Sequence, residues 1–151
     1  MITKLDITFS NIMANPLFAD ALDTTGVQIS DSFEDCNVLT YMKGSLEHSS
    51  ATLLDFTTAS DQFENGWIYN YVRLVIVRAL SGDQPLIVMD VVGGYIGCEL
   101  YPPGELVIRR PKNKPLLTFL VGGILLQTNM LSGIVKPVEY EIIVVGKGEM
   151  T

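Results

Sequence analysis

Few residues of this chain have the types and spacing that enzymatic chemistry requires. The sequence contains one histidine, His48, and two cysteines, Cys36 and Cys98. Hydrolytic triads need a nucleophile, a base and an orienting acid in one place, and the chain has no G-x-S-x-G segment to present a serine. We therefore expect a protein that is not an enzyme. Both cysteines are interpreted as reduced thiols, with Cys98 a small core residue.

The acidic residues do not have the spacing of a metal site. Residues 31–35 lack the alternating oxygen ligands, the central glycine and the terminal glutamate of a calcium loop. An irregular stretch separates Asp55 from Asp61, which fixes no geometry for paired catalytic carboxylates. We expect these two aspartates to cap turns. The glycine-rich stretches 92–97 and 146–148 open no predicted helix, so they indicate no phosphate or cofactor site.

One basic cluster is a candidate binding site. Four positive charges lie within six residues of a chain whose net charge is −7: Arg109, Arg110, Lys112 and Lys114. No aromatic residue lies within the cluster, and the first 70 residues carry two lysines against ten acids. Both features argue against a nucleic-acid partner. Two interpretations stay open for the cluster: a solvated loop, or a docking site for the acidic surface of a neighbouring chain.

The elements that must position these residues are predicted to be strands. After Tyr69, the apolar residues fall into short runs rich in valine, isoleucine and leucine, and glycine or proline ends each run. Such runs at close spacing favour an all-β fold, an antiparallel, jelly-roll-like β-sandwich. The predicted strands are 71–80, 86–92, 95–100, 106–108, 116–121, 124–127 and 138–145, with weaker candidates at 2–9, 38–46 and 51–56.

The chain length of 151 residues fits one domain. We place the sandwich at residues 41–151 and interpret residues 1–40 as an irregular N-terminal arm. This first segment is acidic, rich in turn signals and poor in long apolar runs, with a short helical turn predicted at 16–22. An arm of this kind is expected to order on its partner.

Tyr71–Leu80 is the strand with the strongest signal for a partner. Both of its faces are apolar apart from Arg73 and Arg78, as in a central strand or one whose outer face meets another chain. A hydrophobic content of 48% and a mean hydropathy of +0.31 are also high for a free monomer. We therefore expect a homo-oligomer. The predicted contact residues on one face of this strand are Tyr71, Val75 and Val77.

Two further expectations concern connections and the membrane. Residues 81–85 are predicted to join strand 71–80 to strand 86–92 as a hairpin. The uncharged stretch 116–135 is long enough to span a bilayer as a helix, but residues 127–129 are three consecutive polar residues. We interpret this stretch as two buried strands with a Gly-Gly turn, followed by a loop. The start of the chain lacks a signal-peptide pattern, so we expect cytoplasmic synthesis and no membrane association.

Several turn and strand signatures resemble those of small virion structural proteins of tailed bacteriophages. The similarity covers roughly residues 45–146. It rests on Leu-Leu-Asp-Phe at 53–56, an Asp…Asn-Gly turn at 61–66 before the long strand at 72–78, Pro-Pro-Gly within 100–109, and Tyr-Glu-Ile-Ile-Val-Val-Gly closing 138–146.

The resemblance implies a head decoration or cement subunit, which would stabilise the phage head by binding the major capsid protein. At three-fold positions of the shell, such a subunit is expected to be a trimer. Such a chain would be made in the bacterial host cytoplasm and reside in the virion. Two other functions stay open: a neck or tail adaptor component of the virion, and a β-sandwich that binds glycans. An aromatic platform for glycans would consist of Trp67, Tyr69, Tyr71, Tyr95 and Tyr101.

Overall fold

The computed structural model of the chain describes residues 2–9, 27–47, 49–61, 63–92, 96–128 and 136–151. These residues form an all-β fold with one short helix, as the sequence predicts. The elements are β1 (Ile2–Phe9), β2 (Val27–Phe33), β3 (Val38–Leu46), β4 (Ala51–Asp55), β5 (Ala59–Ser60), β6 (Gly66–Ser81), β7 (Leu86–Asp90), β8 (Gly97–Leu100), β9 (Gly104–Arg109), β10 (Leu116–Leu117), α1 (Thr118–Val121), β11 (Gly123–Thr128) and β12 (Val138–Met150).

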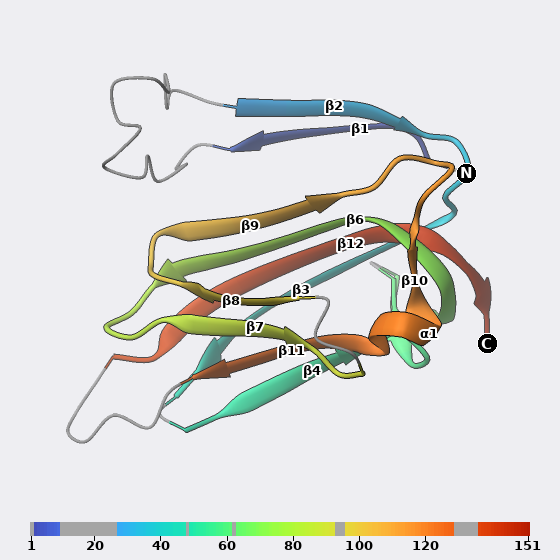
Figure 1. Cartoon of the computed structure of the whole chain (residues 1–151). Helices are drawn as coiled ribbons and strands as arrows, with labels where there is room; N and C mark the ends of the chain where they lie inside the picture. The colour runs from blue at the N-terminus through green and yellow to red at the C-terminus, as the bar shows by residue number, and fades with distance from the viewer. Residues whose placement is uncertain (1, 10–26, 48, 62, 93–95, 129–135) are drawn as a thin grey trace.

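Two antiparallel sheets face each other (Figure 1). The large sheet has the order β3, β12, β6, and the far edge of β6 pairs in turn with β5, β10 and β9. The small sheet has the order β4, β11, β7, β8. β1 and β2 pair with each other as a separate antiparallel hairpin. β1 has the bounds that the sequence predicts, whereas β2 was not predicted, because its residues were placed in the irregular N-terminal arm.

The inner core lies between the two sheets and consists mainly of branched aliphatic side chains. Fully buried residues of β6 and β12 meet those of β7 and β11. Each side chain of this kind that leaves water stabilises the fold by about 1.5–3 kcal/mol, before the cost of ordering the chain. The central contributors are Val75, Val77, Val88, Ile124, Leu126, Ile142 and Val144.

A β-bulge in β6 changes which side chains face this core. Gly146 of β12 pairs with Val72, whereas Val145 pairs with Leu74, so Arg73 is an extra residue. The bulge puts Val72 in phase with Val75 and Val77, which face the inner core. Strict alternation places Val72 with Leu74 instead, so the predicted division of this strand into two faces is wrong at its first residues.

The outer side of the large sheet carries a second, smaller cluster that includes residues of the predicted arm. We call it the outer cluster, and it consists of Phe33, Cys36, Leu74, Ile76 and Val145. All five side chains are essentially inaccessible to solvent. The packed domain therefore begins by Phe33, and the boundary proposed at residue 40 falls inside β3. The predicted helical turn at 16–22 lies outside the described residues.

Two connections differ from their predictions. Residues 81–85 link β6 in the large sheet to β7 in the small sheet, so they form a crossover between sheets and not a hairpin. The predicted strand 116–121 is a two-residue strand followed by α1. Gly122 closes this turn because its N–H donates to the Thr118 carbonyl at 2.7 Å, with a φ of 73° that suits glycine. The described residues include no helix with the length and apolar character that crossing a bilayer requires.

Candidate protein-interaction site

The basic cluster lies on a loop whose two ends are fixed to β6. We call residues 109–114 the basic loop. It leaves β9 and returns at β10, and both strands pair with β6. Inside the loop, the Lys114 N–H donates to the Pro111 carbonyl at 3.0 Å, and Arg110 Nε donates to the Lys114 carbonyl at 3.0 Å. These bonds, together with Pro111 inside the loop and Pro115 directly after it, restrict the conformations of the loop before any partner binds.

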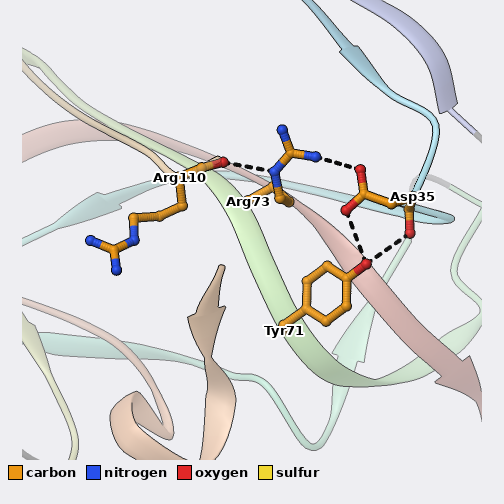
Figure 2. Close-up of polar contacts among 4 residues, drawn as sticks. All are labelled: Asp35, Tyr71, Arg73 and Arg110. Atoms are coloured by element: carbon orange, nitrogen blue, oxygen red, sulfur yellow. Dashed lines mark hydrogen bonds and ion pairs between the residues drawn. The ribbon is translucent and has the colours of Figure 1, made fainter. Parts of the chain in front are cut away.

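Arg110, the second residue of the basic loop, is hydrogen-bonded to Arg73, the extra residue of the bulge in β6 (Figure 2). The Arg110 N–H donates to the Arg73 carbonyl at 2.8 Å, and Arg73 Nε donates to the Arg110 carbonyl at 2.7 Å. The Arg73 guanidinium also forms an ion pair with Asp35 and lies 5.2 Å from the centroid of the Phe33 ring. One side chain thus joins the residues after β2, the centre of β6 and the basic loop.

The Arg73–Asp35 pair is buried and well bonded. The two side chains are only 6% and 9% exposed. The Tyr71 hydroxyl donates to the Asp35 carboxylate at 3.0 Å and lies 3.1 Å from its backbone carbonyl. Burial, together with the hydrogen bond to Asp35, raises the pKa of Tyr71 to about 12. A buried pair of this kind is costly to break on one side, because the remaining charge is left without a partner.

The charged side chains of the basic loop border two depressions of the protein surface. Arg109, Arg110, Lys112 and Lys114 are all exposed. A hollow of about 450 Å³ lies among Arg73, Arg109, Arg110 and Lys112. A groove of about 420 Å³ has Arg110 and Lys114 beside an apolar floor that includes Leu116. Guanidinium and ammonium groups around such depressions suit carboxylates, which arginine binds in a bidentate manner.

The three predicted contact residues on β6 do not form an outward face. Val75 and Val77 are 0% exposed and belong to the inner core, so that prediction is wrong for both. Tyr71 packs beside the outer cluster, with its hydroxyl bonded to Asp35. Sequence reasoning noted Arg73 as an exception in an apolar strand but missed its pairing with Asp35. A lone arginine in a buried strand is the signal that a nearby carboxylate must accompany it.

The aspartates predicted to cap turns do so. Asp55 accepts bonds from the Thr57 N–H and hydroxyl, both at 2.7 Å. Asp61 accepts bonds from two backbone N–H groups, from the Asn65 amide and from Trp67 Nε1, the last at 2.8 Å. Desolvation opposes ionisation of Asp61, but these hydrogen bonds outweigh it and lower its pKa to about 2.

The remaining candidate groups are scattered. Within the described ranges, no three His, Cys, Asp or Glu side chains lie close enough to hold a metal ion. Both cysteines are free thiols there, and His48 lies outside those ranges. At least one of the aromatic residues suggested for glycan binding is inaccessible to a ligand. Tyr69 is 2% exposed, with its hydroxyl 2.8 Å from Thr40 Oγ1, whereas Tyr101 is exposed and Tyr95 is outside the described residues.

No protein-family model, curated protein or solved structure matches the chain.

Proposed function

We propose that the chain is a non-enzymatic structural protein of a tailed-bacteriophage virion, a decoration or cement subunit that stabilises the head by binding the major capsid protein. The observation that supports this proposal best is the basic loop. The loop presents four exposed cations in a chain of net charge −7. It is held by internal hydrogen bonds and by bonds to the buried residue Arg73. An acidic surface on a neighbouring virion protein is the partner that this charge distribution fits.

The proposed mechanism of binding follows from the restricted conformation of the basic loop. Each exposed ion pair contributes only about 0–1 kcal/mol, so no single cation is expected to dominate. Because the loop is already held by bonds to Arg73 and Lys114, little conformational entropy is lost on docking. Several weak pairs can then act together, and long-range attraction speeds the encounter at low salt.

The proposal includes self-association, with the trimer as the expected assembly, and residence in the virion after synthesis in the host cytoplasm. It needs no cofactor and no active site. The same physical features suit a neck or tail adaptor. The copy number per particle separates the two positions, because a cement subunit covers the shell whereas an adaptor forms one ring.

Co-sedimentation with purified phage heads that lack the chain tests the proposal. The key variant is Lys112→Ser/Lys114→Ser, and its matched control is Lys136→Ser/Lys147→Ser, which changes net charge equally at exposed sites outside the loop. We expect the wild type and the control to sediment with heads and the loop variant to bind at least several-fold more weakly. Equal binding by both variants would exclude the basic loop as the contact. No sedimentation by any form would contradict the proposed function.

A further inference from the structure

Side chains on the outer face of the large sheet form rows that run from β3 at one edge to β9 at the other. Among the described residues, no strand pairs with the outer side of β3 or of β9. From β3 to β9, one row reads Lys43, Glu141, Arg78 and Glu105. The neighbouring row reads Tyr41, Ile143, Ile76 and Val107.

The first row alternates in charge and ends with opposite signs at the two edges. Arg78 bonds Glu141 at 2.9 Å and Glu105 at 3.2 Å, so the centre of the row is a continuous ion-pair chain. Lys43 extends it on the β3 side as the residue opposite Glu141. The second row is apolar, and its two end residues are the exposed ones: Tyr41 is 49% exposed and Val107 is 39% exposed.

We infer that copies of this chain associate head to tail, with β9 of one copy pairing antiparallel with β3 of the next, so that the large sheet continues across the joint. In the register that continues the rows, Glu105 lies opposite the next copy's Lys43 and Val107 lies opposite the next copy's Tyr41. The joint thereby adds an opposite-charge pair and an aromatic–β-branched pair, two kinds of cross-strand pair that stabilise sheets.

The backbone geometry supports the same register. Neighbouring strands from β3 to β9 are all antiparallel, so a β3 oriented like the first one is antiparallel to β9. The bond from the Arg110 N–H to the Arg73 carbonyl shows that Ile108 and Leu106 direct their backbone groups toward β6. Glu105 and Val107 therefore direct theirs outward. The same alternation, followed through β6 and β12, directs the groups of Tyr41 and Lys43 outward from β3.

Two symmetric joints are less complete. β3 contains no acidic residue, so pairing β3 with β3 leaves Lys43 without an acid within the joint. Pairing β9 with β9 around Val107 can match Glu105 with Arg109, but it leaves all of β3 open, with Tyr41 exposed. The head-to-tail joint covers both edges. It is a heterologous contact, which is the kind that a cyclic trimer requires. The inference deepens the self-association part of the proposed function and makes no use of a capsid.

Disulfide trapping on the purified chain tests the joint. Lys43→Cys and Glu105→Cys are made separately in a Cys98→Ser background, since Cys36 is buried. Opposed residues of a hydrogen-bonded antiparallel pair have Cα atoms about 5.5 Å apart, within the range that a disulfide spans. We expect covalent dimers when the two variants are mixed and oxidised, and only background levels from either alone. The double variant Lys43→Cys/Glu105→Cys should form covalent rings whose size reports the oligomer order.

Register and symmetry are controlled with two more variants, and circular dichroism verifies the fold of each protein. The first is Arg109→Cys, mixed with Lys43→Cys. Residue 109 is four positions from residue 105, about 13 Å along the strand from the position opposite residue 43, so this mixture should not cross-link. Dimers from Lys43→Cys alone or from Val107→Cys alone would show a symmetric joint and overturn the inference. The absence of cross-links between Lys43→Cys and Glu105→Cys would overturn it as well. Because no particles are used, failure here and failure to bind heads are separate results.

Discussion

At the scale of single residues, the buried Asp35–Arg73 ion pair joins the segment after β2 to β6 and, through Arg73, to the basic loop. Asp35→Ala leaves the buried Arg73 guanidinium without its partner, and we predict a loss of about 3–5 kcal/mol in the free energy of unfolding. Arg73→Met added to Asp35→Ala should recover most of the loss, because an apolar side chain then fills the site. Urea denaturation gives the free energy of unfolding of the wild type, of Asp35→Ala and of the double variant. A double variant no more stable than Asp35→Ala would show that the uncompensated charge is not the cause.

The single tryptophan reports on the turn that Asp61 caps. Trp67 Nε1 donates to the Asp61 carboxylate, whose pKa is lowered to about 2 from an ordinary value of 3.8. This depressed pKa contributes stability that is present above pH 3.8 and lost as the pH falls through 2. We predict a change in Trp67 fluorescence with a midpoint near pH 2, and no such transition in Asp61→Ala. A wild-type midpoint near pH 4 would contradict the bonding described for this turn.

Alkaline pH should act through Tyr71. Its pKa is raised from 10.0 to about 12, so the folded chain holds this proton more tightly than the unfolded chain. The stabilisation is therefore fully present below pH 10 and is lost as the pH rises through 12. We predict that the melting temperature falls over this window and that Tyr71→Phe falls less steeply. Burial also raises the pKa of the Cys36 thiol to about 12, which adds a loss of the same sign that both proteins share. Identical slopes for the two proteins would exclude Tyr71 as a contributor.

At the scale of elements, the basic loop should act collectively. Replacing Arg109, Arg110, Lys112 and Lys114 with serine should change the melting temperature little, because these side chains are exposed and the bonds between the Arg110 backbone and Arg73 remain. The change does remove the bond from Arg110 Nε to the Lys114 carbonyl. Attachment to phage heads should weaken, most strongly at low ionic strength, where screening is least. Binding measured across a salt series checks this. Attachment that is indifferent both to the fourfold change and to salt would show that the loop is only a solvated turn.

Local sequence patterns predicted where the strands lie in the chain better than which of their faces are buried and what those faces contact. Runs of valine, isoleucine and leucine ended by glycine or proline located nearly every strand after Val38, because these signals are local in the chain. The faces of β6 were not predictable, since the bulge at Arg73 depends on how β12 pairs with it. Gly146 is part of that pairing, because a side chain there would meet the Tyr71 carbonyl at 2.2 Å. Likewise, the sequence identified the basic loop itself. Its bonds to Arg73, and the pairing of Arg73 with Asp35, were not predictable because they join residues far apart in the chain.

At the scale of the whole molecule, the residues just before β3 belong to the fold. Deletion of 2–36 removes Phe33, Asp35 and Cys36, which exposes the outer cluster and leaves Arg73 unpaired. We predict that this truncation does not fold, whereas deletion of 2–26 keeps a cooperative thermal transition. Circular dichroism melting curves distinguish the two. A folded 2–36 deletion would restore the original view that the domain begins near residue 40.

The whole assembly joins the two proposals: head-to-tail copies linked through β9 and β3, attached to a phage head through their basic loops. The two proposed contacts share only Arg109, which ends β9 and begins the basic loop, so variants at other positions disrupt them separately. In these proposals, Glu105 and Lys43 belong to the joint between copies, whereas Lys112 and Lys114 belong to the attachment to the head.

Quantitative mass analysis of density-purified particles, from a phage whose genome encodes this chain, determines whether the chain is part of the virion. We predict that the chain migrates with intact heads, in a copy number comparable with that of the major capsid protein. A copy number matching a single ring would instead place it at the neck or tail. Absence of the chain from purified particles, with all of it in the soluble fraction of the lysate, would show that it is not a virion structural protein.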